Sequence, residues 1–126
     1  MSEITEGATV LPRDGYPAGV PCFIDTSQRD AESAQRFYGG LFGWEFAEIV
    51  PGRYWMARID GLDVAGLSVQ TDNTPSWNTY IEVADADQAT ADALQLGAHV
   101  LAPPMDVLDA GRMSIIADPS GAVFST

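Results

Sequence analysis

The side chains that most often carry chemistry are scarce in this chain. Its 126 residues include a single histidine, His99, and a single cysteine, Cys22. A site that one chain builds from two imidazoles, or from a cysteine and histidine cluster, is therefore excluded, and with it most zinc, non-haem iron and copper centres. A carboxylate site for magnesium or calcium stays open, because aspartate and glutamate together number 18.

Two carboxylates stand at matching places in similar stretches of sequence. Phe23-Ile24-Asp25 and Tyr80-Ile81-Glu82 read alike, and each comes shortly before a helix pattern. If the two stretches meet, Asp25 and Glu82 form a pair in which one carboxyl has a raised pKa and acts as general acid or base. The alternative is that both lie near a rim, solvated or paired with an arginine, Arg58 or Arg112.

The single histidine and the single cysteine are not predicted to have a catalytic or ligand-binding role. His99 opens a strand pattern directly after a glycine turn, and we interpret it as a structural or surface histidine, with a functional role as the alternative. Cys22 neighbours Phe23 in a strand pattern, so it should point to the opposite sheet face. There it would be a buried, inert thiol.

Hydrophobic periodicity predicts one domain after a flexible N-terminal arm at residues 1–19. Residues 20–70 read as a strand, a helix and three strands, and residues 77–126 repeat that order with a period of about 55 residues. The predicted strands are residues 20–26, 45–49, 53–59, 63–69, 77–83, 99–102, 112–117 and 122–125, and the predicted helices are residues 31–42 and 85–96. The first helix begins after a capping Asp30 and ends at Gly43. We expect its aromatic run to form the core between helix and sheet: Phe37, Tyr38, Phe42, Trp44 and Phe46.

Composition limits the class of partner. The chain has a mass of 13.5 kDa, 46% hydrophobic residues, a formal net charge of −12 and a pI near 4.1. This charge repels phosphate backbones and anionic membranes, so neither nucleic acid nor a membrane is an expected partner. One cysteine without a possible internal disulfide, and no signal-peptide pattern, favour a cytoplasmic protein.

Two tandem βαβββ modules of this length resemble the vicinal oxygen chelate superfamily, the glyoxalase/bleomycin-resistance/dioxygenase group. The local motifs Phe37-Tyr38, Leu41-Phe42-Gly43-Trp44 and Asp118-Pro119-Ser120-Gly121 are similar to those of the superfamily. Residues 37–46, together with Trp77-Asn78-Thr79-Tyr80 and Gly121-Ala122-Val123-Phe124, resemble its bacterial glyoxalase-like "hydroxylase" subgroup. The resemblance implies an α+β fold whose modules form a cup-shaped, half-open barrel. It also implies a homodimer, and a chain shortened relative to members that carry two such domains.

Metal-dependent members of that superfamily place His, Gln or Glu on the first, fourth, fifth and eighth strands. The matching positions here are Phe23, Gly66, Asn78 and Ser125. These side chains offer neither an imidazole nor a deprotonated donor, so we expect no metal cofactor at the usual site.

Strand alternation then assigns a lining to the cup. The residues that alternation turns inward mix apolar surface with a few polar groups, and the candidate ligand-binding residues among them are Phe23, Asp25, Gly66, Asn78, Tyr80, Glu82 and Ser125. Trp77, at the mouth of the fifth predicted strand, is a further candidate for a ligand or subunit contact. This mixture predicts metal-independent binding of a small, largely apolar or aromatic organic molecule. The alternatives are an enzyme of the same superfamily, lyase-, isomerase- or dioxygenase-like or acting by acid/base catalysis through Asp25 or Glu82, and a structural half that needs a second copy. Whether Trp55 or the pair Tyr54 and Met56 faces the cup stays open.

Overall fold

The computed structural model describes residues 15–72, 74–108 and 111–126. Most of the predicted arm, residues 1–14, lies outside the described residues. The first module contains β1 (Pro21–Gln28), α1 (Ala31–Phe42), β2 (Glu45–Val50), β3 (Tyr54–Ile59) and β4 (Leu62–Val69). The second contains β5 (Ser76–Ile81), α2 (Ala86–Gln95), β6 (His99–Val107), β7 (Gly111–Ala117) and β8 (Val123–Ser125). The predicted tandem βαβββ order is therefore confirmed.

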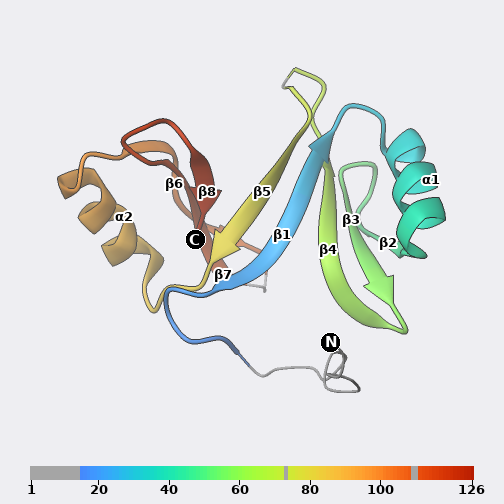
Figure 1. The fold of residues 1–126 in the computed structure, drawn as a ribbon, viewed down its shortest axis with the longest axis horizontal. Coiled ribbons are helices and arrows are strands. Elements are labelled where there is room, and N and C mark those ends of the chain that lie inside the picture. Colours follow the sequence, from blue (N-terminus) through green and yellow to red (C-terminus); the bar gives the residue numbers. More distant parts are fainter. Residues whose placement is uncertain (1–14, 73, 109–110) are drawn as a thin grey trace, which may run out of the picture.

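All eight strands form one curled mixed sheet in the order β2-β3-β4-β1-β5-β8-β7-β6. Within each module the first strand pairs in parallel with the last, β1 with β4 and β5 with β8. The modules meet where β1 and β5 pair antiparallel. Figure 1 shows β1 and β5 at the centre, with α1 and α2 at opposite sides of the molecule. The predicted half-open barrel of two modules is confirmed.

Both helices start on an aspartate cap at the equivalent place in each module. The Asp30 carboxylate accepts the N–H groups of Glu32 and Ser33, and the Asp85 carboxylate accepts the N–H of Gln88. These bonds satisfy helix donors that have no partner within the helix. The caps fix the correspondence between modules, because Asp25 and Tyr80 each lie five residues before their cap.

One strand is longer than the sequence pattern predicts. β6 runs to Val107 rather than residue 102, past Pro103 and Pro104. Its pairing with β7 shifts register between Ala102 and Met105. Because β6 is the edge strand, prolines that lack an N–H are accommodated at this irregularity.

The buried side chains lie mainly on the helix side of the sheet. Under α2, Ser114 is buried and bonds the hydroxyls of Thr90 and Thr126, both at 2.9 Å. Among the described residues no helix is long and apolar enough to cross a membrane.

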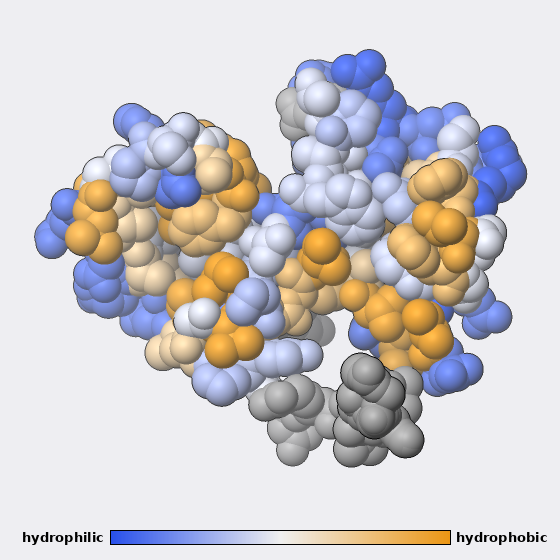
Figure 2. All heavy atoms as spheres, viewed as in Figure 1, coloured by the Kyte–Doolittle hydropathy of each residue, from blue (hydrophilic) through white to orange (hydrophobic). Residues whose placement is uncertain are grey.

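The prediction that the α1 aromatics form a core is wrong in part. Phe37, Leu41 and Phe42 are 60%, 59% and 52% exposed, and Figure 2 shows apolar side chains at the surface over α1. The rings do contact one another, with Tyr38 against Phe37, Phe42 and Trp44. Among the residues of α1 only Ala34 is buried, so most of the helix's aromatic side chains stay partly open to solvent.

Candidate functional site

The centre of the cup holds a buried carboxylate between two phenols. Asp25 on β1 is only 6% exposed. Its Oδ2 accepts hydrogen bonds from the Tyr80 hydroxyl at 2.8 Å and the Tyr54 hydroxyl at 3.2 Å. A buried carboxylate with two donors from separate strands is a costly arrangement to build, and such groups gather at functional sites.

The strand register brings these groups together. Asp25 lies opposite Gly66 of β4 on one side and Asn78 of β5 on the other. In the next pair along the same face, Phe23 lies opposite Tyr80, with ring centroids 5.6 Å apart. Ser125 of β8 pairs with Tyr80 and extends this face into the second module. The four predicted metal-position residues thus share the cup face with Asp25 and Tyr80.

Gly66 makes room for Tyr54. The Tyr54 ring lies over this glycine, and a Cβ on Gly66 would overlap the Tyr54 hydroxyl and stand 2.6 Å from its Cζ. The ring can reach Asp25 only across a residue without a side chain. The orientation that the sequence left open is settled, because Tyr54 and Met56 pair with cup-facing Ser68 and Gly66.

Burial dominates the ionisation of this cluster. It raises the pKa of the Asp25 carboxyl above its usual 3.8, while hydrogen bonds from Tyr80, Tyr54 and Asn78 lower it without cancelling that effect. Burial, reinforced by the nearby Asp25 charge, raises the pKa of both Tyr54 and Tyr80 above the ordinary 10.0. The phenols are therefore neutral donors, and Asp25 is the acidic group of this cluster.

The Asn78 amide links the cluster to Ser125. Its Nδ2 donates to the Ser125 Oγ at 2.7 Å, while its Oδ1 is buried without a hydrogen-bond partner among the described residues. The two ends of an amide have nearly the same shape. In the opposite orientation the oxygen would accept from the Ser125 hydroxyl, and the NH₂ would take the place of the unpartnered oxygen.

The residues present do not fit a divalent metal. At the four positions, Phe23 and Gly66 offer no donor atom, and Asn78 and Ser125 are bonded to each other. The phenols beside Asp25 are held in their neutral form, which is the wrong form for a metal ligand. The described residues contain no group of three or more His, Cys, Asp or Glu side chains that could hold an ion.

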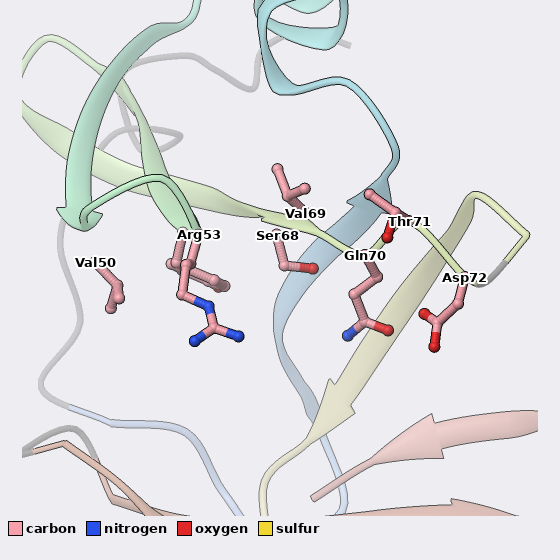
Figure 3. A pocket seen from close by; sticks show the side chains of 8 residues that line it. Val50, Arg53, Ser68, Val69, Gln70, Thr71 and Asp72 are labelled. Carbon is pink, nitrogen blue, oxygen red and sulfur yellow. The ribbon is translucent and has the colours of Figure 1, made fainter.

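An open hollow adjoins the cluster where β3 begins and β4 ends. It has a volume of about 620 Å³, within the range of sites for small organic molecules. Tyr54 and Ser68 belong to both the cup face and the hollow, which connects the two. Figure 3 shows the lining, which consists of Val50, Arg53, Tyr54, Ser68, Val69, Gln70, Thr71 and Asp72.

The hypothesis of a pair between Asp25 and Glu82 is wrong. The register and the helix caps make Tyr80 the counterpart of Asp25. Glu82 lies past the end of β5, where its carboxylate neighbours the Cys22 thiol. The alternative partners are also wrong, because Arg58 pairs with Asp63 and Arg112 pairs with Asp87 and Asp106.

Three other sequence-predicted placements are resolved. Trp77, a candidate ligand-binding residue, lies outside the cup, because it pairs with Thr26 on the helix side and its ring contacts Tyr38 at 5.3 Å. Cys22 is half-buried rather than buried, at a register shift in β1. His99 is exposed at the start of β6, in agreement with the surface interpretation.

Tyr54 is the member of the Asp25 cluster that the sequence did not assign to the cup. Its strand pattern Tyr54-Trp55-Met56 alternates without showing which side is inward. The usable signal was Gly66, since a glycine inside a strand often marks a close approach by a neighbouring group.

The sequence matches a known domain family. The family described as "Glyoxalase-like domain" matches residues 22–126. A protein named as a glyoxylase, CFP32 of Mycobacterium tuberculosis, is 39% identical over 119 residues, which cover 87% of this chain and 46% of that protein. The anthracycline biosynthesis protein DauV of a Streptomyces species is 33% identical over 129 residues, which cover 87% of this chain and 47% of DauV. The chain thus spans about half the length of these relatives.

Solved structures agree on the fold. Methylmalonyl-CoA epimerase of Streptomyces coelicolor superposes with a TM-score of 0.62 at 19% identity, over 86% of this chain and 96% of that one. Homoprotocatechuate 2,3-dioxygenase of B. fuscum gives a TM-score of 0.62 at 16% identity, over 90% of this chain and 34% of that one. With the sequence match, this likeness confirms the expected superfamily. The chain belongs to the glyoxalase-like domain family, within the vicinal oxygen chelate superfamily.

Proposed function

We propose that the cup and its adjoining hollow bind a small, largely apolar or aromatic organic molecule without the help of a metal. The observation that carries this proposal is the Asp25 cluster, which occupies the cup centre where the metal-position residues lack suitable donors. The hollow next to Tyr54 supplies space, and the rings of Phe23 and Tyr80 supply apolar surface. Sparse, fixed polar groups in such a lining orient a ligand.

The name of one relative supports an aromatic ligand. DauV, 33% identical to this chain, is named for anthracycline biosynthesis, and anthracyclines are planar polycyclic aromatics. A neutral anthraquinone, 2-(hydroxymethyl)anthraquinone, is therefore a suitable first probe. The expected homodimer and cytoplasmic location remain predictions beside this one.

We expect Tyr54→Ala to weaken binding of this anthraquinone by about 10-fold or more, because stacking on an aromatic wall is lost. The measurement is a calorimetric titration of the wild type and the variant, before and after dialysis against EDTA, with affinity unchanged by the chelator. Ser68→Leu, which fills the hollow, should weaken binding as well. Phe37→Ala is the matched control, since it removes an exposed aromatic ring from the opposite side of the sheet. Loss of binding in the control alone, or after chelation, contradicts the proposal.

A second candidate function, proton transfer, is favoured by the raised pKa of Asp25 inside the cup. The Asp25 carboxylate would accept a proton from carbon beside a carbonyl and leave an enolate, whose charge the phenols of Tyr54 and Tyr80 would stabilise. The proton on the Asp25 carboxyl would exchange with solvent, and a solvent-derived proton would then return to the same carbon.

A test of proton transfer is deuterium exchange at C1 of 2-tetralone in D₂O, followed by NMR. We expect the wild type to accelerate this exchange and Asp25→Asn to abolish the acceleration, an effect of about 100-fold or more. Glu82→Gln is the control, because Glu82 lies away from the cluster. Exchange at the uncatalysed rate with the wild type would contradict the proton-transfer proposal and leave the binding proposal standing.

A further inference from the structure

The hollow contains a cation that no carboxylate in the described part of the chain neutralises. Arg36, Arg58 and Arg112 each form an ion pair with a carboxylate. Arg53 lines the hollow and has no such ion pair with any described residue. Arg53 is exposed, so its guanidinium is open to a ligand that enters the hollow.

The backbone holds Arg53 in a defined place. It follows a tight turn at Pro51-Gly52, where Gly52 has a φ of +70°. The Arg53 N–H donates to the Val50 carbonyl at 2.9 Å, and its own carbonyl accepts from Val69 at 3.1 Å. The nearby Glu48 carboxylate is already engaged, because its Oε2 accepts the Gly52 N–H at 2.8 Å. In Figure 3 the Arg53 side chain extends into the same space as Gln70, with Asp72 on the far side.

We infer that the hollow recognises the acidic group of its ligand, a carboxylate that the Arg53 guanidinium binds, so that the ligand is an apolar or aromatic organic acid. This inference rests on the proposed binding function. A guanidinium matches the two oxygens of a carboxylate and can donate two parallel N–H···O hydrogen bonds to them. Tyr54 and Val69 border the same hollow and supply the surface for the apolar body.

Asp72 defines the orientation of that ligand. Its carboxylate lies across the hollow from Arg53 and repels an anion there. The acidic end must therefore lie at the Arg53 side, and the opposite end must be neutral or a hydrogen-bond donor. An acid bound in reverse would place two carboxylates together.

The test compares two probes that share one ring system, anthraquinone-2-carboxylate and the neutral 2-(hydroxymethyl)anthraquinone, by calorimetric titration. The wild type should bind the carboxylate about 10-fold tighter, with a preference that falls as salt is added. Arg53→Gln should remove the preference, so that the variant binds the two probes with equal affinity. Arg53→Lys should retain part of the preference, and Asp72→Asn should increase it. Arg36→Gln, a surface arginine on α1, is the control and should change nothing.

The possible outcomes distinguish a failure of this inference from a failure of the proposed binding function. Equal binding of both probes by the wild type, or a preference that survives Arg53→Gln, overturns the inference and leaves the binding function standing. Failure of both probes to bind overturns the proposed function and this inference with it.

Discussion

Gly66→Ala is expected to lower the free energy of unfolding by about 2–3 kcal/mol, a large effect for one methyl group. The added Cβ would overlap the Tyr54 hydroxyl, stand 2.6 Å from its Cζ and lie 3.0 Å from the Asp25 Cβ. Tyr54 must then leave Asp25, which removes a donor from a buried carboxylate. Urea denaturation of the wild type and the variant measures this change.

The cause can be isolated with a second substitution. In a Tyr54→Ala background the ring that obstructs the Cβ is absent, so Gly66→Ala should cost less than about 1 kcal/mol. Gly40→Ala is the matched control, because Gly40 lies inside α1 with no atom of the described residues near its Cβ position, and it should be neutral or stabilising. A full cost for Gly66→Ala without Tyr54 would show that the ring is not the obstacle.

Asp25→Asn is expected to stabilise the fold at neutral pH and to weaken or abolish the function of the cup. Burial raises the pKa of Asp25 in the folded state, so the native protein binds this proton more tightly than the unfolded chain. The stability linked to this proton is fully present below pH 3.8 and is lost as pH rises through the folded-state pKa. At pH 7 the ionised carboxylate therefore destabilises the fold, by about 1.4 kcal/mol for each unit of pKa difference.

The measurement is the free energy of unfolding of both proteins from pH 4 to 8. The curves should converge at the acid end and separate above it, with the Asp25→Asn variant the more stable at pH 7. Asp63→Asn is the control, since Asp63 is an exposed strand aspartate paired with Arg58, and its effect should be small. A variant that is less stable than the wild type at neutral pH would show that hydrogen bonding, rather than burial, dominates at Asp25.

Much of the fold follows from the sequence because its signals are local. The caps Asp30 and Asp85, the αL glycine Gly43 and the turn at Asp60-Gly61 fix where elements begin and end. The repeat then fixes the topology, since the same order of elements occurs twice. The bounds that differ, as in β6, depend on pairing with a neighbouring strand, which local pattern does not encode.

The sequence predicts which strand residues face the cup, but it does not predict which of their side chains contact one another. Alternation placed Asp25, Asn78 and Tyr80 on one side correctly. The match of Asp25 with Glu82 relied on similar tripeptides, which are offset by two residues from the true correspondence through the caps. Trp77 was misplaced because its position at the mouth of the strand was weighed above alternation, which sets it on the opposite face from Asn78, where its ring contacts Tyr38.

The correspondence between Asp25 and Tyr80 bears on how the protein arose. The backbone of the two modules is alike, yet one contributes the acceptor and the other the donor of the central hydrogen bond. Two identical modules joined in the same way would set like against like, either aspartate facing aspartate or phenol facing phenol. A gene that doubled first and whose copies then diverged at these two positions would account for an asymmetric cup inside a repeated architecture.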